Sequence, residues 1–213
     1  MTGKFIVLEG IDGSGTTTQA QRLANYLFEK DKKNLMVLSR EPTKISPYGI
    51  ELRRRLENKL LPDEKKIDDP AYWANLFIND RQWHLDTVVV PNVKVGLHVI
   101  SDRHKLSTIA YQSAQDGDMD ELIQRHEKMY RADLTLLLDC PADVAAQRMK
   151  RERGAPEYFE KLEIQKKVRD NYLLAVDRLK DKERIITLDG SLPLIIVTEA
   201  IQNEVDLLYG LVK

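Results

Sequence analysis

The sequence predicts an α/β protein with a parallel sheet covered by helices on both faces. Short, continuous apolar runs alternate with longer amphipathic stretches, and no repeat of about 20–50 residues interrupts the alternation. Strands that are apolar throughout are typical of parallel sheets, because helices bury both faces of such sheets. Right-handed crossovers then give a doubly wound fold that binds ligands at the carboxyl ends of its strands.

Five short runs are the expected strands, and six longer patterns are the expected helices. The strands are predicted at residues 4–9, 35–39, 97–101, 134–139 and 184–188. A glycine-rich turn follows the first strand and leads into a helix that runs through Lys30. Further helical patterns cover residues 48–60, 70–90, 105–130, 142–180 and 193–211. Polar residues end each of the first four strands, so we expect the chemistry at that edge of the sheet.

Length and charge narrow the class of protein. The chain has 213 residues, which favours one domain, and 33 basic against 34 acidic residues leave a net charge of −1. This balance argues against a nucleic-acid polymer as partner, since such proteins usually carry a strongly basic face. The single cysteine, Cys140, fits a reducing compartment, and no apolar run is long enough to cross a membrane. We therefore expect a cytoplasmic protein without a membrane partner or a signal peptide.

A glycine-rich loop follows the first strand and opens a helix. Its spacing matches the phosphate-binding pattern G-x-x-x-x-G-K-[ST] at every position but one, and Thr17 takes the place of the hydroxyl residue that binds Mg²⁺. Glycines let successive backbone N–H groups point at a phosphate, next to the positive end of the helix. A turn without a ligand is the alternative. The residues expected to bind a phosphorylated cofactor are Gly10, Ile11, Asp12, Gly13, Ser14, Gly15, Thr16, Thr17 and Thr18.

The one departure from this pattern is Thr16, where the pattern has lysine. That lysine normally brings a positive charge to the β- and γ-phosphates. Losing one such donor at a transition state typically lowers a rate by about 10²–10³-fold. The loop still predicts phosphate binding, whereas catalysis then depends on positive charge from elsewhere in the chain.

A basic run, with Arg148, Lys150, Arg151 and Arg153, leads into glycine and proline at positions 154 and 156. Glycine and proline break helices, so the run is predicted to pass into a mobile basic loop between two helices. The alternative is an ordinary solvated helix end, at which arginines complement the helix dipole.

Several segments together resemble the thymidylate kinase family of P-loop nucleoside monophosphate kinases. They cover residues 5–19 (FIVLEGIDGSGTTTQ), 39–43 (SREPT), 76–84 (LFINDRQWH), 100–112 (ISDRHKLSTIAYQ) and 133–139 (DLTLLLD), with a lid-like stretch at 151–158. The resemblance implies a three-layer P-loop kinase fold with five parallel strands in the order 2-3-1-4-5. It implies a single domain over residues 1–213 with a lid at about 148–160. It also implies ATP as phosphate donor, Mg²⁺, dTMP as acceptor and a homodimer.

The resemblance assigns the acceptor site residue by residue. Phe77 would stack on thymine, and Arg81, one helical turn away, would donate to a base carbonyl. Without the family match, a core phenylalanine and a surface arginine are the simpler interpretation. Arg103, in the family's D-R-Y motif, would bind the dTMP phosphate, as would Arg40 in the R-E-P stretch. The third motif residue is His104 here, which either donates in place of the tyrosine or only packs.

Further roles follow from the same resemblance. Asp102 would help to hold hydrated Mg²⁺ with Thr17. Tyr111 would lie against the 2′ position of the sugar, and Gln112 would approach the base. Asp12 would lie near the 3′-hydroxyl and the metal, unless it only forms a turn with its own backbone.

The family places a transition-state arginine either in the phosphate loop or in the lid. Ser14 occupies the loop position, so Arg151 and Arg153 are the candidates and would offset the charge missing at Thr16. The expected catalytic residues are Arg103, Arg151, Arg153 and Asp102.

Three questions stay open at the level of sequence. A kinase for another nucleotide, and a nucleotide-binding protein with weak or no kinase activity, remain as alternative functions. The segment at 189–191 either contacts adenine or forms a plain turn. The helix face around Trp73, Leu76, Trp83 and Val88 is either core or a dimer interface.

Overall fold

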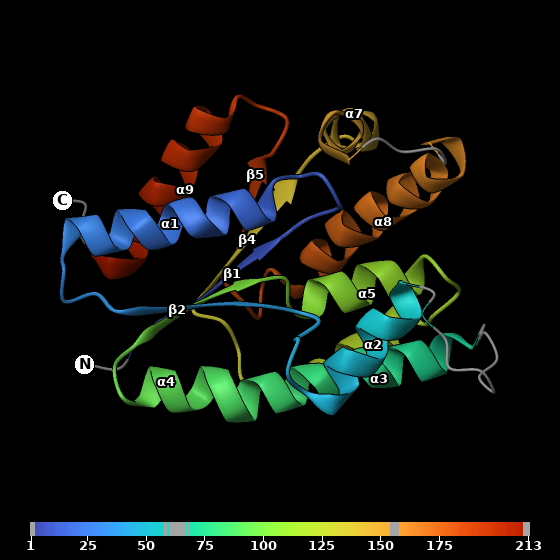
Figure 1. Ribbon diagram of the computed structural model, residues 1–213, viewed down its shortest axis with the longest axis horizontal. Coiled ribbons are helices and arrows are strands. Elements are labelled where there is room, and N and C mark those ends of the chain that lie inside the picture. Colours follow the sequence, from blue (N-terminus) through green and yellow to red (C-terminus); the bar gives the residue numbers. More distant parts are fainter. Residues whose placement is uncertain (1–2, 58, 60–66, 68, 154–157, 211–213) are drawn as a thin grey trace.

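A five-stranded parallel sheet forms the centre of the protein, between two layers of helices (Figure 1). The computed structural model describes residues 3–57, 59, 67, 69–153 and 158–210. The strands are β1 (Phe5–Glu9), β2 (Met36–Arg40), β3 (His98–Asp102), β4 (Leu134–Asp139) and β5 (Ile185–Asp189), in the order β2-β3-β1-β4-β5. The predicted fold class and the predicted strand order are confirmed.

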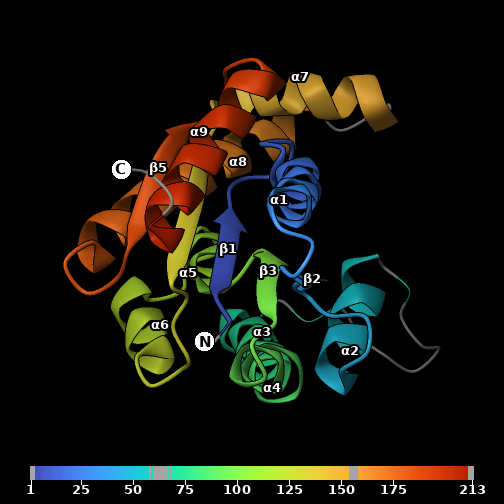
Figure 2. The same ribbon diagram turned by 90° about the vertical axis from the view of Figure 1, so that its left-hand side faces the viewer.

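Helices connect the strands and cover the sheet on both faces. They are α1 (Thr16–Lys30), α2 (Pro47–Leu56), α3 (Pro70–His84), η1 (Leu85–Val89), α4 (Val90–Lys94), α5 (Lys105–Ser113), α6 (Met119–His126), α7 (Ala142–Arg153), α8 (Tyr158–Leu179) and α9 (Leu194–Tyr209). Helices α1 and α9 pack on one face, while α3, α4, α5 and α8 lie toward the other (Figure 1). Figure 2 shows α2 on the same side of the molecule as the edge strand β2.

Alternation along the buried strands separates the two halves of the core. Ile6 and Leu8 pack with α1 and α9, whereas Phe5 and Val7 face the residues of η1 and α4. A third cluster joins Leu137 of β4 to apolar residues of α5 and α8. In β1 and β3 the central residues are buried, and polar side chains at the carboxyl ends, such as Glu9 and Asp102, lie where the loops meet.

Two of the expected helices have different limits in the structure. The pattern at 105–130 is two helices, because Asp116 takes a positive φ of 65° and Asp118 caps a new helix by accepting from the backbone N–H groups of Asp120 and Glu121. The pattern at 70–90 continues to Lys94 through the π-helical turn η1, next to Pro91, which has no N–H to donate.

The long pattern at 142–180 is interrupted between α7 and α8, where the sequence predicted a basic loop. Residues 154–157 of the expected lid lie outside the described residues. Within the described ranges, no helix is both long enough and apolar enough to cross a lipid bilayer.

Candidate active site

The loop between β1 and α1 has the backbone conformation that phosphate binding requires. Gly13 and Gly15 have positive φ values of 86° and 98°, which side-chain-bearing residues rarely adopt. A Cβ atom at Gly13 would lie 2.4 Å from the carbonyl oxygen of Ala145, so this position also needs glycine for space. No side chain caps α1 at Gly15, and its first N–H groups therefore remain available to an anion.

A cavity of about 670 Å³ lies over this loop and forms the candidate donor cavity. All nine loop positions predicted to bind the cofactor, except Gly10, line it, together with Gln19, Arg40, Arg103, Arg148, Met149, Gly190, Ser191, Leu192, Pro193, Leu194 and Val197. Among the described lining residues, the basic ones are three arginines and no lysine. The positive charge of this cavity therefore comes from outside the loop.

Arg148 is a residue of the donor cavity that the sequence did not single out within the basic run. Its Nη1 donates to the carbonyl oxygen of Gly190 at 2.7 Å, and its Nη2 donates to that of Ser191 at 3.0 Å. The Asp189 carboxylate accepts from the Ser191 backbone N–H at 2.9 Å. The segment at 189–191 is thus a turn that also borders the donor cavity, and its contact with adenine stays a prediction.

Thr17 and Asp102, the two predicted metal ligands, lie in direct contact. Thr17 Oγ1 donates to Asp102 Oδ2 at 2.5 Å, and Arg40 Nε lies 3.5 Å from the same oxygen. Asp102 Oδ1 is buried and has no hydrogen-bond partner among the described residues. Mg²⁺ prefers oxygen ligands of this kind and usually keeps several waters. This hydroxyl–carboxylate pair therefore fits a hydrated magnesium ion.

Arg103 connects the two halves of the site. It follows β3 with a φ of 81°, a conformation that costs energy in a non-glycine residue and is often found at functional sites. Its Nη1 donates to the Gly10 carbonyl oxygen at 3.0 Å, and its Nη2 donates to Asp12 Oδ1 at 2.7 Å. Arg103 lines both cavities, as Arg40 does, so a phosphate on either side can reach both guanidinium groups.

The second cavity, of about 530 Å³, is the candidate acceptor cavity. Every residue predicted to bind the acceptor lines it: Asp12, Arg40, Phe77, Arg81, Arg103, Tyr111 and Gln112. They come from the loop after β1, the ends of β2 and β3, and helices α3 and α5. Residues that the sequence did not place here also line it, namely Glu41, Pro42, Arg53, Leu56, Ile67, Trp73, Ser107, Thr108 and Gln115.

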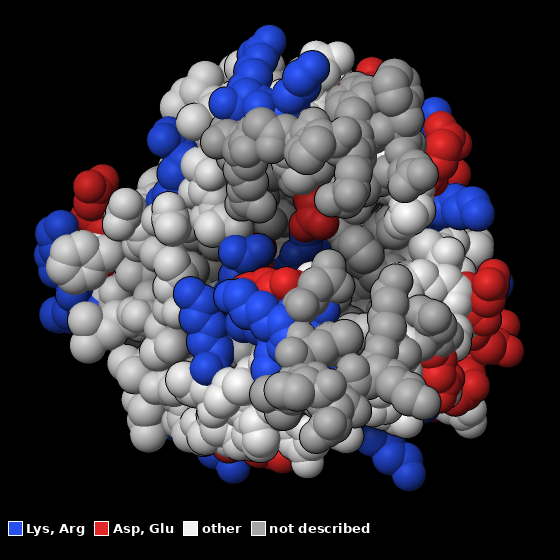
Figure 3. Space-filling model, turned by 45° about the vertical axis from the view of Figure 1, so that its right-hand side comes forward, with Lys and Arg blue, Asp and Glu red and all other residues white. Residues whose placement is uncertain are grey.

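The space-filling view shows where charged side chains lie on this face of the molecule (Figure 3). Lysine and arginine side chains gather beside a hollow in the surface, with acidic side chains among them (Figure 3). The net charge of the chain is only −1, so this basic character is local. It suits small phosphorylated molecules.

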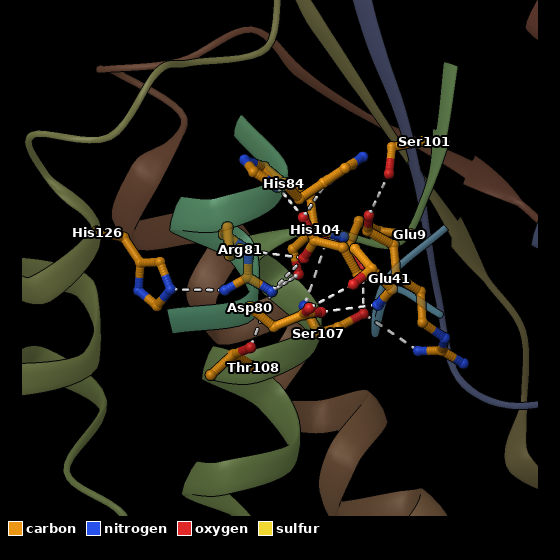
Figure 4. Close-up of polar contacts among 12 residues, drawn as sticks. Glu9, Glu41, Asp80, Arg81, His84, Ser101, His104, Ser107, Thr108 and His126 are labelled. Carbon is orange, nitrogen blue, oxygen red and sulfur yellow. Dashed lines mark hydrogen bonds and ion pairs between the residues drawn. The ribbon is translucent and has the colours of Figure 1, made fainter. Parts of the chain in front are cut away.

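A buried polar network holds Arg81 at the floor of the acceptor cavity (Figure 4). Arg81 is only 1% exposed, and its Nε donates to Glu41 Oε2 at 2.9 Å. The other oxygen of Glu41 lies 2.9 Å from His84 Nδ1 and 3.2 Å from His104 Nδ1. His104 is therefore a buried partner of Glu41, which answers the question that the sequence left open about this histidine.

Burial decides the charge state of this network. Burial lowers the pKa of His104 to about 4, against the opposing effect of Glu41, so the imidazole is neutral near neutral pH. Burial alone would raise the pKa of Glu41, but the adjacent Arg81 guanidinium holds that pKa well below its ordinary value. The core of the network is therefore the Glu41–Arg81 ion pair with the neutral His104 imidazole beside it.

Tyr111 forms the wall of the acceptor cavity next to the loop. Its hydroxyl accepts from the Asp12 backbone N–H at 3.2 Å, and burial raises the pKa of Tyr111 to about 12. Gln165 of α8 also contacts Tyr111, and its Oε1 is buried without a partner among the described residues. The contact of Gln165 with Tyr111 could not be predicted from the sequence, because Gln165 lies 54 positions beyond Tyr111 on a different helix.

The two lid arginines are not part of either cavity as described. Arg151 is exposed near the end of α7 and is absent from the described lining residues. The side chain of Arg153 lies outside the described residues. The catalytic roles of Arg151 and Arg153 stay predictions, and for Arg151 the role requires this helix end to approach the phosphates.

The shared position of Arg40 and Arg103 between a phosphate loop and a second cavity is the arrangement expected of a P-loop phosphotransferase. Residues 8–201 match the sequence model of the family described as thymidylate kinase. The chain therefore belongs to the thymidylate kinase family and is an ATP-dependent nucleoside monophosphate kinase by class.

Individual relatives agree with this assignment over most of their length. The chain is 42% identical over 173 residues to a probable thymidylate kinase of Pyrococcus horikoshii, covering 81% of this chain and 82% of that protein. It is 35% identical over 188 residues to a probable thymidylate kinase of Thermococcus kodakarensis, covering 87% and 90%. A thymidylate kinase of Desulfotalea psychrophila is 38% identical over 167 residues, covering 78% of each chain.

Proposed function

We propose that this protein transfers the γ-phosphate of ATP to dTMP, giving dTDP and ADP, as a step in dTTP synthesis. The observation that carries the proposal is the acceptor cavity. All seven residues assigned to dTMP from the family resemblance line this one cavity, and two of them, Arg40 and Arg103, also border the donor cavity. Family membership supports the same reaction.

In this proposal, the acceptor nucleotide lies with its base over Phe77 and toward Arg81, and with its phosphate toward Arg40 and Arg103. Stacking on an aromatic ring contributes about 1–3 kcal/mol per base. Tyr111 lies against the sugar and leaves little room for a 2′-hydroxyl. The attacking phosphate oxygen is already anionic, so catalysis depends on positioning and on charge stabilisation, with no need for a strong general base.

The donor triphosphate lies over the loop, with its phosphates at the free N–H groups of α1. Thr17 and Asp102 would hold the magnesium ion, which neutralises charge on the donor phosphates when bound. Arg103, which contacts the Gly10 carbonyl oxygen, stands where it can stabilise charge that develops between the two substrates. Arg151 and Arg153 would add charge in place of the lysine missing at Thr16.

The proposal also includes a cytoplasmic homodimer. The helix face that the sequence offered either as core or as dimer interface is half-buried at Leu76, Trp83 and Val88, whereas Trp73 lines the acceptor cavity. Exposed apolar side chains near the edge strand β2, among them Leu38 and Ile45, give such an interface further apolar area.

The test is an ADP-release assay with ATP and a panel of monophosphates, with and without Mg²⁺. We expect dTMP to have the highest kcat/KM and the rate to fall to background without Mg²⁺. A higher kcat/KM for dUMP, dGMP or thymidine would identify a kinase for another acceptor. Binding of ATP and dTMP without any phosphate transfer would identify a nucleotide-binding protein.

A further inference from the structure

The hydrogen-bonding capacity of Arg81 is almost entirely used within the described part of the chain. A guanidinium group has five N–H donors. Nε donates to Glu41 Oε2, and Nη2, which also lies 2.7 Å from that oxygen, donates to the His104 carbonyl oxygen at 2.8 Å and to Thr108 Oγ1 at 2.9 Å. Nη1 lies 2.7 Å from His126 Nε2. One Nη1 hydrogen therefore remains for a ligand in the acceptor cavity, which Arg81 lines.

His126 can fill its place only as an acceptor. It is 2% exposed, and its Nδ1 lies 2.6 Å from the carbonyl oxygen of Leu122 on the same helix, α6. A carbonyl oxygen only accepts, so Nδ1 carries the hydrogen and Nε2 presents a lone pair to Arg81. Burial, together with the Arg81 charge, holds the pKa of His126 well below its ordinary value, which keeps this lone pair free.

We propose that His126 is a positioning residue for base selection: it takes one Nη1 hydrogen of Arg81 and so leaves a single fixed N–H for a carbonyl oxygen of the acceptor base. Figure 4 shows this contact on the side of Arg81 opposite Glu41. The proposal rests on the proposed function, because it takes the acceptor to be a pyrimidine deoxynucleoside monophosphate.

A base with an amino group at that ring position would be rejected. The amino group would point a donor at a donor, and Arg81 could not turn away, since contacts on three sides hold its guanidinium plane. Sites built to donate to one group discriminate strongly against an analogue that cannot accept, because a buried donor is left unpaired. Thymine and cytosine differ in this way only at position 4, so the arrangement would select thymine over cytosine if the recognised oxygen is the 4-oxygen.

The test is a cycle that pairs His126 variants with altered bases. His126→Met replaces the ring nitrogen with a thioether sulfur, which is only a weak acceptor, and His126→Gln keeps an acceptor oxygen at similar reach. The acceptors are dTMP and the two pyrimidinone deoxynucleoside monophosphates that lack either the 4-oxygen or the 2-oxygen. For His126→Met we expect the KM for dTMP to rise about tenfold with little change in kcat, as expected when a binding contact is lost. His126→Gln should stay within about threefold of the wild type.

The decisive result is whether the rise in KM caused by His126→Met disappears on one of the two analogues. If His126 acts through Arg81 on one carbonyl oxygen, the tenfold effect should shrink to less than about twofold on the analogue that lacks that oxygen. An equal penalty on all three acceptors, or none on dTMP, would overturn the proposal. His126→Leu serves in the same cycle if His126→Met does not fold.

Two controls separate this proposal from the proposed function. His98 is a histidine outside the acceptor cavity, with Nδ1 accepting from the Lys4 backbone N–H at 2.9 Å, and His98→Gln should leave KM for dTMP unchanged. The wild-type protein is assayed first on dTMP. Failure to phosphorylate dTMP would refute the proposed function. Normal activity on dTMP, with an equal change in KM on all three acceptors in the His126 variant, would refute only the role of His126.

Discussion

The donor and acceptor cavities lie side by side but are built in different ways. The donor cavity consists largely of backbone, with glycines at positive φ, an uncapped helix start and exposed side chains at Asp12 and Thr17. The acceptor cavity has charged and polar side chains at its floor, and Glu41 and Arg81 are 3% and 1% exposed. The donor cavity is built to bind phosphate through backbone N–H groups, which do not depend on side-chain identity. The acceptor cavity is built to bind its ligand through particular side chains.

This difference predicts where substitutions should matter most. Backbone donors survive the loss of a side chain, which is consistent with a phosphate loop that has Thr16 in place of lysine. A buried network has less tolerance, because a buried polar atom that loses its partner cannot turn to water instead. Changes on the acceptor side should therefore affect stability and selectivity together, and changes on the donor side should affect the rate.

The largest effect is expected from Glu41→Gln, which removes the counter-ion of buried Arg81. Breaking a buried ion pair by removing one partner typically costs about 3–5 kcal/mol in the free energy of unfolding. Urea denaturation measures this loss. The matched control is Glu163→Gln on α8, where the carboxylate pairs with Lys166 and both side chains are exposed, so the cost should stay below about 1 kcal/mol. Equal losses in both variants would contradict the contrast between buried and exposed pairs.

A smaller but still large effect is expected from Arg103→Lys. The charge remains, but the planar fork that contacts both Gly10 and Asp12 is lost, and kcat/KM for dTDP formation should fall about 100-fold. Arg169→Lys is the control, since Arg169 forms a two-point ion pair with Asp139 and lines neither cavity among the described residues. If both variants keep more than about one-third of the wild-type kcat/KM, Arg103 does not bridge the substrates.

The donor cavity should gain activity from Thr16→Lys. A lysine here adds the charge that the phosphate-loop pattern normally supplies, and we expect kcat to rise about tenfold, with arginines already present limiting the gain. Gln21→Lys, on the exposed face of the same helix, changes the net charge equally and should leave kcat unchanged. An unchanged or lower kcat in Thr16→Lys would show that the cavity is built around threonine.

The sequence predicted the parts of the molecule whose residues act locally. Strand positions followed from apolar runs, and the phosphate loop followed from glycine spacing within eight residues, Gly10 to Thr17. Helix ends were less well predicted, because the break near Asp118 depends on a local cap that the apolar pattern does not show. The seven acceptor-site residues were found through family resemblance, since they come from five segments of the chain.

Partnerships between distant residues could not be predicted. Arg81 meets Glu41 and His126, which stand 40 and 45 positions away in the sequence. Nothing in a buried histidine's neighbours along the chain indicates which side chain its ring nitrogens will contact. Arg148 shows the same limit, because its carbonyl partners at Gly190 and Ser191 come from the loop after β5.

The smallest effect concerns the pH dependence of stability in the acceptor network. The folded-state pKa of His104 is about 4, below the ordinary 6.5, so the unfolded chain binds more protons between these values and stability falls as the pH is lowered through this window. Between pH 7 and pH 6 the contribution of His104 is less than about 1 kcal/mol. Glu9 has the opposite effect on the pH dependence of stability, because burial raises the pKa of Glu9.

The test is His104→Asn, which keeps a donor for Glu41 but does not titrate. This variant should flatten the slope of unfolding free energy against pH over this range. The control is His98→Gln, which leaves the network intact and should change the slope less, because His98 is only half-buried. A slope that is the same in His104→Asn as in the wild type would mean that burial does not hold His104 neutral in the folded protein.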